Sequence, residues 1–273
     1  MLRTTQDLEH YAIGATDGDI GHVKDLYFDD DAWVIRYLVV DTGDWLPGRR
    51  VLVSPIALRE PDWIARTLPA SITREQVRDS PDIDTKRPVS RQQESLWLQH
   101  YGYGDYWGGT SLWGEGMYPY AMAPGFLVDG IGRPEAGRAE ALVREGEQAR
   151  RRNDDPHLRS CNEVRGYHLH ATDGEIGHVA ALLVDDETWA IRYLVVETGH
   201  WWLGHKVLIA PTWITGVSWT DGTVSVDLDR EAVRSAPAYV AADDWSRERD
   251  VRLFEHYGRT WYGAGAMSLA SEF

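Results

Sequence analysis

One segment of the chain occurs twice, and this internal repeat constrains the fold more than any other feature. Residues 15–55 read ATDGDIGHVKDLYFDDDAWVIRYLVVDTGDWLPGRRVLVSP, and residues 171–211 read ATDGEIGHVAALLVDDETWAIRYLVVETGHWWLGHKVLIAP. The copies align without a gap at an offset of 156 residues, and 25 of the 41 positions are identical. Solenoid repeats are much shorter, about 20–50 residues. The chain therefore contains a duplicated domain.

Within each copy, short apolar runs alternate with turn signals, a pattern typical of β-strands. Asp17-Gly18 and Asp173-Gly174 place a glycine where a tight hairpin turn requires positive φ. The runs that follow are rich in β-branched and aromatic residues, which suit a pleated and packed surface. We therefore expect a small barrel or sandwich of short strands. The first strand of each copy is expected over residues 7–13 and 163–169.

Two short helices are predicted after each copy. Thr73 and Gln76 have the spacing of a capping box, and Asp229 stands at the start of the corresponding segment of the second copy. The second helix of each pair is expected over residues 90–100 and 246–256. Gly102 and Gly258 follow these segments and are predicted to end the helices.

Three motifs shared by the copies resemble those of a known family. They are T-D-G-x-I-G-H-V, D-D-x-x-W-x-I-R-Y-L-V-V-x-T-G and W-x-x-G-x-x-V-L, and they resemble the PRC-barrel domain. That domain is the small β-barrel of the photosynthetic reaction-centre H subunit and of the ribosome-maturation factor RimM. The resemblance implies a mainly β fold with added α: two small PRC-type β-barrels, each followed by short C-terminal helices.

The repeat divides the chain into three expected parts. Residues 1–101 form the first barrel with its helices, residues 102–160 form a Gly-rich and aromatic linker with a helix over 133–153, and residues 161–273 form the second barrel with its helices. Fused copies resemble a covalent isologous dimer, so we expect the barrels to be related by an approximate two-fold axis and to contact each other. Residues 101–126 carry many aromatic side chains, so we expect this segment to be docked rather than flexible.

Charge and composition exclude several classes of function. The chain has 43 acidic and 28 basic residues, a formal net charge of −15, which repels nucleic-acid phosphates and predicts no nucleic-acid partner. No apolar run approaches the roughly 20 residues of a transmembrane helix. The first residues lack the apolar core of a signal peptide, so a cytoplasmic location is expected. A single cysteine, Cys161, excludes an intrachain disulfide and a multi-cysteine metal site.

Neither a phosphate-binding glycine loop nor a G-x-S-x-G nucleophile motif occurs, and there is no haem or iron–sulfur motif. We therefore expect no enzymatic activity and no cofactor. The weak candidates for a metal site are the carboxylates in the glycine turns. These are Asp17, Asp19, Asp173 and Glu175. Neither copy has the full carboxylate pattern of a calcium loop, so stabilisation of the turn is the favoured explanation.

Several histidines and arginines allow two interpretations. His22 and His178 occupy matching positions, where a structural hydrogen bond is favoured over acid–base chemistry. His100 and His256 are explained by the dipole at a helix C-terminus. Arg36 and Arg192 interrupt an apolar strand, and the sequence leaves open whether they are buried. A buried arginine would need a carboxylate partner, for which the candidates are Asp25, Asp41 and Glu197.

The excess of aromatic residues points to packing surfaces, since the chain has 13 Trp and 13 Tyr. Trp and Tyr are common interface anchors, and the candidates here are Trp45, Trp107, Trp113, Trp201, Trp202, Tyr101 and Tyr257. Packing within the protein is favoured over a ligand site. We expect a non-catalytic binding or assembly (adaptor) protein with an unidentified protein partner, and homo-oligomer formation is left open. The alternatives are a small-ligand or metal-binding protein that uses the turn carboxylates and, by family analogy, an accessory to an electron-transfer or photosynthetic complex.

Overall fold

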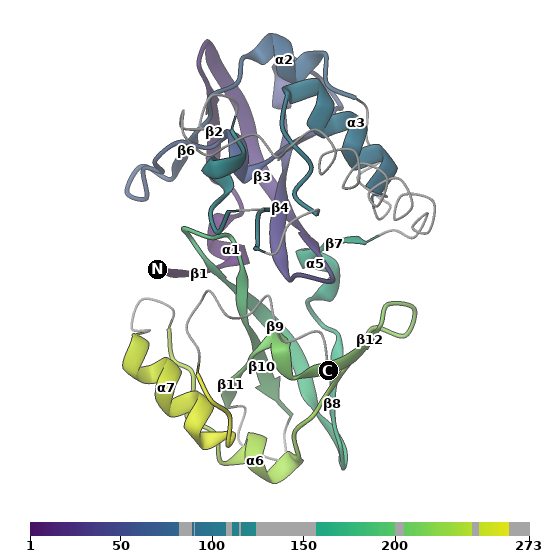
Figure 1. Ribbon diagram of the computed structural model, residues 1–273, viewed down its shortest axis with the longest axis vertical. Helices are drawn as coiled ribbons and strands as arrows, with labels where there is room; N and C mark the ends of the chain where they lie inside the picture. The colour runs from purple at the N-terminus through teal and green to yellow at the C-terminus, as the bar shows by residue number, and fades with distance from the viewer. Residues whose placement is uncertain are drawn as a thin grey trace, which may run out of the picture. The chain divides into compact units, whose positions relative to one another are not determined.

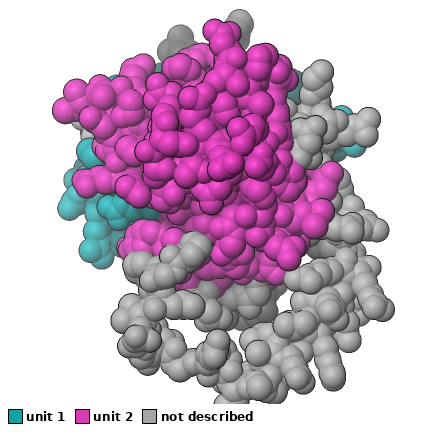
Figure 2. All heavy atoms as spheres, turned by 90° about the horizontal axis from the view of Figure 1, so that it is seen from above, with its two compact units in different colours: residues 1–8, 161–273 teal, residues 9–160 magenta. Residues whose placement is uncertain are grey.

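The computed structural model divides into two compact units, coloured separately in Figure 2. Unit 1 comprises Met1–Leu8 and Cys161–Phe273, and unit 2 comprises Glu9–Ser160. Unit 2 therefore holds the first sequence copy, and unit 1 holds the second. The structure describes residues 1–81, 89, 91–107, 111–114, 116–123, 157–199, 205–241 and 246–261. Residues 1–8 therefore group with the second copy. The three-part division expected from the repeat stays a prediction.

Unit 2 is built on a six-stranded mixed sheet, drawn in Figure 1. Its strands are β2 (Ala12–Ala15), β3 (Gly18–Asp29), β4 (Val34–Asp41), β5 (Arg50–Val53), β6 (Thr67–Pro69) and β7 (Leu158–Ser160). The strand order is β5-β4-β3-β2-β6, and β7 pairs with β3. All neighbours are antiparallel except β2 and β6, which are parallel.

Unit 1 repeats this sheet with one strand more. Its strands are β1 (Leu2–Thr4), β8 (His168–Ala171), β9 (Gly174–Asp185), β10 (Ile191–Thr198), β11 (Lys206–Ile209), β12 (Ile214–Ser218) and β13 (Thr223–Val226). The order is β11-β10-β9-β8-β13-β12, and β1 pairs with β9. The predicted hairpin at Asp221-Gly222 is confirmed, since it joins β12 to β13 and Gly222 has a φ of 62°.

The two sheets are open in their strand order, so the prediction of closed barrels is wrong. Closure of the first sheet would require a ladder between its end strands, β5 and β6. Instead the short 3-10 helix η2 (Pro55–Ala57) begins two residues after β5, and η5 (Pro211–Trp213) begins two residues after β11. In unit 2 the chain beyond η2 makes only an isolated antiparallel bridge, Leu58 to Ala70, beside β6.

The two helices predicted after each copy are confirmed, and two short helices that were not predicted, α1 (Thr5–Leu8) and α5 (Cys161–Val164), precede the first long strands. The predicted helices are α2 (Arg74–Arg78), α3 (Arg91–Tyr101), α6 (Arg230–Arg234) and α7 (Arg247–His256). The capping box of Thr73 and Gln76 is confirmed, and the Asp229 side chain accepts a bond from the N–H of Ala232. Gly102 and Gly258 follow α3 and α7 with φ values of 71° and 64°. The helix expected over residues 133–153 lies outside the described residues.

The strand predicted over residues 7–13 begins later than expected. The chain first forms α1, whose N-terminus is capped by a bond from the N–H of Asp7 to the side-chain oxygen of Thr4, 3.0 Å long. His10 then takes a positive φ of 73°, and β2 begins only at Ala12. A local side-chain cap therefore outweighs the alternating pattern. The second copy behaves in the same way, with α5 before β8.

A glycine in the shared I-G-H-V motif has a clear steric role in each unit. A Cβ on Gly21 would lie 1.9 Å from the carbonyl oxygen of Asp41, and a Cβ on Gly177 would lie 2.1 Å from that of Glu197. No side chain fits at either distance. Only glycine therefore lets β3 and β9 approach the neighbouring strand this closely.

The described part of the aromatic segment after α3 is docked on unit 2. Tyr103, Tyr106, Leu112 and Trp113 are all buried. The ring of Tyr103 stacks on that of Tyr101 with 5.7 Å between centroids. The expectation of a docked segment is thus confirmed for these residues.

Candidate functional site

Each unit receives one strand that precedes the other copy in the sequence. β1 pairs with β9 in the register Leu2 to Asp185, Arg3 to Val184 and Thr4 to Leu183. β7 pairs with β3 in the register Leu158 to Asp29, Arg159 to Phe28 and Ser160 to Tyr27. At the offset of 156 residues these pairs are equivalent one by one. The duplicated chain therefore places the same strand against the same edge in both units.

An ion pair fixes each added strand at its centre. The Nε atom of Arg3 lies 3.1 Å from a carboxylate oxygen of Asp186, and the Nε atom of Arg159 lies 2.8 Å from one of Asp30. The side chains of both pairs are half-buried. Burial raises the pKa of Asp30, and the bond from Arg159 offsets this only in part. The paired arginine therefore keeps a partly desolvated carboxylate in place.

In unit 2 a buried carboxylate connects the added strand to the rest of the unit. Glu94 of α3 is only 1% exposed. Its carboxylate accepts a 2.9 Å bond from the hydroxyl of Tyr37 and a further short bond from the hydroxyl of Tyr106. The Nε2 atom of His157, the residue before β7, lies 3.0 Å from its second oxygen. Glu94 therefore links β4, α3, the aromatic segment and the start of β7.

The Tyr37 hydroxyl is held in its neutral form by this environment. Burial and then the charge of Glu94 raise the pKa of Tyr37 well above its ordinary value. A neutral phenol donates a hydrogen bond to the carboxylate, whereas a phenolate would repel it. The neutral Tyr37 hydroxyl thus remains a hydrogen-bond donor to Glu94 within this buried cluster.

Arg36 is buried at 3% exposure. The sequence had left open whether this side chain is buried or lies at the surface. Its guanidinium donates a 2.7 Å bond to the carbonyl of Leu112 and lies over the rings of Tyr106 and Trp113, at 3.7 and 4.6 Å. Its carboxylate partner is Asp29, at 3.7 Å. The arginine therefore serves as the anchor for the docked aromatic segment through cation–π contacts.

Arg192 of unit 1 is also buried, at 6% exposure, but its partner differs. It lies 3.3 Å from a carboxylate oxygen of Asp250 on α7, and the hydroxyl of Tyr193 donates a short bond to the same carboxylate. None of the expected partners of the two arginines proved correct. Asp25, Asp41 and Glu197 were chosen for closeness in sequence, whereas the actual partner Asp250 is brought in by a helix.

Two of the turn carboxylates cap helices. The Asp17 side chain accepts a 2.8 Å bond from the N–H of Arg74 at the start of α2. Asp173 accepts an equivalent 2.9 Å bond from the N–H of Arg230 at the start of α6. This stabilises the helix N-terminus, where N–H groups lack partners. The acceptor role was expected, but the donor lies in a distant helix rather than in the turn itself.

The remaining carboxylates and the histidines of the motifs lie at the surface. Asp19, Glu175, His22 and His178 are all exposed. The two helix-end histidines instead make matching contacts. The Nε2 atom of His100 lies 2.8 Å from the carbonyl oxygen of Gln76, and that of His256 lies 2.8 Å from the carbonyl oxygen of Ala232.

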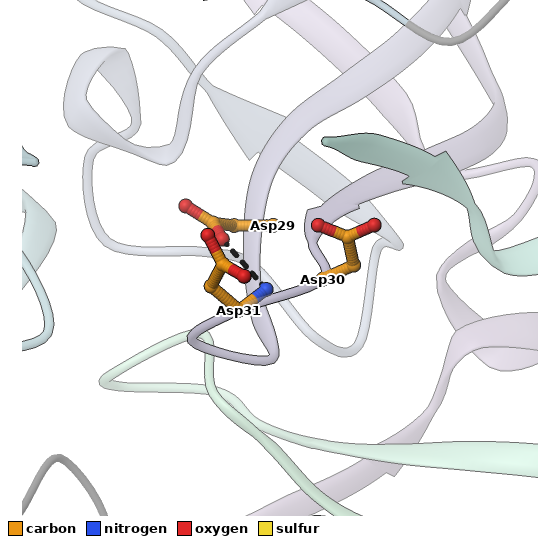
Figure 3. A group of neighbouring side chains, drawn as sticks. All are labelled: Asp29, Asp30 and Asp31. Atoms are coloured by element: carbon orange, nitrogen blue, oxygen red, sulfur yellow. Dashed lines mark hydrogen bonds between the residues drawn. The ribbon is translucent and has the colours of Figure 1, made fainter. Parts of the chain in front are cut away.

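Three consecutive aspartates, the last residue of β3 and the two that follow it, form the group of carboxylates shown in Figure 3. One oxygen each from Asp29, Asp30 and Asp31 lie within 4.8 Å of one another. The Asp29 carboxylate accepts bonds from the N–H groups of Asp31 and Ala32, at 3.0 and 3.2 Å. Since Asp29 also faces Arg36 and Asp30 binds Arg159, turn formation and ion pairing account for this cluster.

Most of the aromatic interface candidates that can be placed are core residues. Tyr101, Trp113 and Tyr257 are buried within their own units, so their rings are not exposed anchors. Trp45 is half-buried; its indole N–H donates a 2.6 Å bond to the carbonyl of Ile20, and Arg74 lies 4.3 Å from its ring. Trp107 is half-buried and packs on Tyr106. Trp201 and Trp202 lie outside the described residues.

The key charged residues were not singled out from the sequence. Glu94, His157 and Asp250 stand outside the motifs that the two copies share. The fold brings Glu94 and His157 close to β4, and Asp250 close to β10. The added strands had a usable signal, because Leu2-Arg3-Thr4 aligns with Leu158-Arg159-Ser160 at the same offset of 156 residues.

Among the helices of the described residues, none has the length and apolar character to cross a membrane. No curated protein matches the sequence. Comparison with models of protein families gives a match over residues 7–64, which cover β2 to η2 and the turn that follows. That match is to the PRC-barrel domain, so the first repeat is shown to be similar to the family that its motifs indicated.

Proposed function

We propose that the protein is a non-catalytic binding or assembly protein that recognises a protein partner. The match of residues 7–64 to the PRC-barrel domain supports a binding role. The observation that carries the proposal is the strand addition at β3 and β9, with its equivalent registers and ion pairs. Both units thus hold an extended segment by main-chain bonds and one charged contact, which is how β-augmentation modules recognise protein segments.

The use of the polar side chains supports a role without catalysis. Asp17 and Asp173 cap helices, and Glu94 and Asp250 hold tyrosine hydroxyls in buried positions. A general acid or base needs a group that can reach a substrate. These carboxylates are committed to internal contacts instead. The cytoplasmic location, the two-fold relation of the copies and an accessory role in electron transfer stay predictions.

A difference between the copies favours unit 2 as the partner-binding unit. Ile64, in the turn before β6, is 99% exposed, and Leu96, on α3, is 57% exposed. The equivalent residues of the second copy are Thr220 and Arg252, which are exposed and polar. Exposure of a large apolar side chain to water is unfavourable in free energy, and burial in an interface with a partner removes that exposure. We therefore propose that Ile64 and Leu96 contact the partner.

Quantitative affinity purification from the native cell tests this proposal, with the full chain as bait. The variant Ile64→Thr/Leu96→Arg replaces both residues with those of the second copy, and Thr220→Ser/Arg252→Lys is the matched control. We expect a stoichiometric partner with the wild type and the control, and at least a tenfold loss with the first variant. Equal recovery of the partner by all three baits would exclude Ile64 and Leu96 as partner contacts. Turnover of a metabolite by the purified chain would contradict the non-catalytic role, and size-exclusion chromatography of the same samples reports self-association.

A further inference from the structure

Unit 1 carries a group of imidazoles that unit 2 lacks. His168 and His170 lie on β8, separated by the buried Leu169. On β9, His178 is directly opposite His168, and Glu175 is directly opposite His170. Four side chains able to ligate a metal therefore occupy one two-by-two patch of an antiparallel ladder.

A β-bulge places all four on the same face of the sheet. In a regular strand, residues 175 and 178 would point to opposite faces, since side chains alternate. The register passes from Leu169–Gly177 to His170–Glu175 and skips Ile176, which is buried. The extra residue brings Glu175 onto the face of His178. Both side chains are exposed, as is His168, while His170 is half-exposed.

One histidine is already oriented by a carboxylate. The Nδ1 atom of His168 lies 2.9 Å from a carboxylate oxygen of Glu175. A carboxylate that binds one ring nitrogen fixes the tautomer and leaves Nε2 as the metal ligand. Opposite residues in a ladder have Cβ atoms about 4.5–5.5 Å apart, a spacing that two imidazoles can bridge to one ion at about 2.0–2.1 Å. Exposed side chains rotate rapidly and can gather around an ion.

We propose that His168, His170 and His178 form a binding site for a divalent transition metal such as Zn²⁺ or Ni²⁺, with Glu175 orienting His168. Imidazole suits these metals better than it suits Ca²⁺ or Mg²⁺. The site lies on the surface of one unit and is independent of the proposed partner-binding residues. Its nearest sequence equivalent in the first copy is Ala12, Gly14, His22 and Asp19, which retains one histidine only.

Isothermal titration of the full, untagged chain with Zn²⁺ and Ni²⁺ tests the proposal, with circular dichroism of each variant as a check of folding. We expect one ion per chain for the wild type and at least a tenfold weaker affinity for His168→Ala and for His170→Ala. Glu175→Gln is expected to weaken binding about tenfold, as is usual for a residue that orients a metal ligand. His22→Ala in the first copy is the matched control and should bind as the wild type does.

A graft provides the second, independent readout. Ala12→His/Gly14→His recreates the patch in unit 2, where a Cβ on Gly14 would meet no atom within 4 Å. We expect the stoichiometry to rise from one ion to two. No binding by the wild type, or wild-type affinity in His168→Ala/His170→Ala, would overturn the proposal, and the second result would direct attention to the Asp29–Asp31 cluster.

Discussion

The two units share their backbone contacts and differ in how buried side chains are paired. Both use a glycine for close strand approach, a turn aspartate as a helix cap, and an added strand fixed by an Arg–Asp pair. Their buried carboxylates diverge. Glu94 of unit 2 is contacted by a histidine and two tyrosines, whereas Asp250 of unit 1 is contacted by Arg192 and Tyr193.

The aromatic cores diverge in a compensating way. The equivalent tyrosines Tyr101 and Tyr257 each pack on a tryptophan, at centroid distances of 4.4 and 4.7 Å. In unit 2 that ring is Trp97 of α3, and in unit 1 it is Trp213 of η5. The equivalent of Trp97 is Leu253, and the equivalent of Trp213 is Ala57; all four are buried. Each unit therefore keeps one tryptophan against the equivalent tyrosine, but the tryptophan comes from a different element.

This comparison shows which positions a duplicated fold can change. A backbone contact such as that of Gly21 has no substitute, because every side chain would clash. A buried side chain can change when a neighbour supplies the lost volume or charge. Four predictions test this distinction, in order of expected effect.

Removal of the buried Glu94 carboxylate in unit 2 is expected to have the largest effect on stability. Glu94→Ala leaves His157 and two tyrosine hydroxyls without their acceptor in a buried place, which we expect to lower the free energy of unfolding of unit 2 by about 3–5 kcal/mol. Denaturant unfolding followed by hydrogen exchange of each unit measures the loss. Asp250→Ala is the counterpart and should affect unit 1 alone. An equal effect on both units would show that the carboxylates do not act within their own units.

The exchange of core volume between elements gives the second prediction. Trp97→Leu is expected to cost about 2–3 kcal/mol of unfolding free energy, as a large-to-small core change. Adding Ala57→Trp reproduces the second copy and should recover at least half of that cost. A double-mutant cycle measures the coupling. Additive losses in the double variant would mean that the two positions do not share one volume.

Alkaline pH should lower the stability of the two units to different extents. Burial raises the pKa of Tyr37 and Tyr103 above the ordinary value of about 10 and that of Tyr101 to about 12, and it raises the pKa of Tyr193 and Tyr257 in unit 1. The folded pKa exceeds the unfolded one. Their contribution to stability is therefore complete below pH ~10 and is lost as the pH rises through the folded values.

Each such tyrosine lowers the free energy of unfolding by at most about 1.4 kcal/mol per pH unit above pH ~10. Three of these five tyrosines lie in unit 2 and two lie in unit 1, so their ionisation should weaken unit 2 more steeply, by about one tyrosine's contribution. Phenolate absorbance and hydrogen exchange at each pH measure this. Tyr103→Phe should remove the difference, and ionisation of all tyrosines near pH 10 in the folded chain would contradict the prediction.

The ion pairs of the added strands should give the smallest effect, equal in both units. Asp30→Asn and Asp186→Asn are each expected to cost about 0.5–1 kcal/mol, in the range of partly exposed pairs. Faster hydrogen exchange at the β3–β7 or β9–β1 ladder measures the change, with the exposed Asp44→Asn as the control. A loss confined to one unit would show that the two strand additions are not energetically equivalent.

Much of the local structure could be predicted from the sequence. The Asp221-Gly222 hairpin, the Thr73 capping box and the glycines after α3 and α7 depend on residues close together in the chain, and each is confirmed. The errors concern longer range. Helix α1, capped by Thr4, occupies the start of the strand expected over residues 7–13. The expected barrels are open sheets, because the end strands of each sheet do not pair with each other.

The candidate site was less accessible to prediction. The motifs located Asp17, Asp173, Arg36 and Arg192 correctly as residues of interest. The partners of Asp17, Asp173 and Arg192 lie on helices, and Arg36 contacts Asp29 at the end of β3 together with the aromatic segment. Arg192 and Asp250 are 58 positions apart. Nothing in a periodic pattern indicates which of many carboxylates will reach a given arginine.

By itself the sequence determined that one β unit is present twice, where its turns and helix ends fall, and that the first repeat is similar to the PRC-barrel domain. Turn glycines, caps and alternation act over a few residues, so they can be read locally. Only the tertiary structure decided that β1 joins the second copy and β7 the first, that Arg36 holds the aromatic segment, and that a bulge gathers Glu175 with three histidines. These outcomes depend on which distant segments meet, since burying charge and apolar area together selects one arrangement of the whole chain.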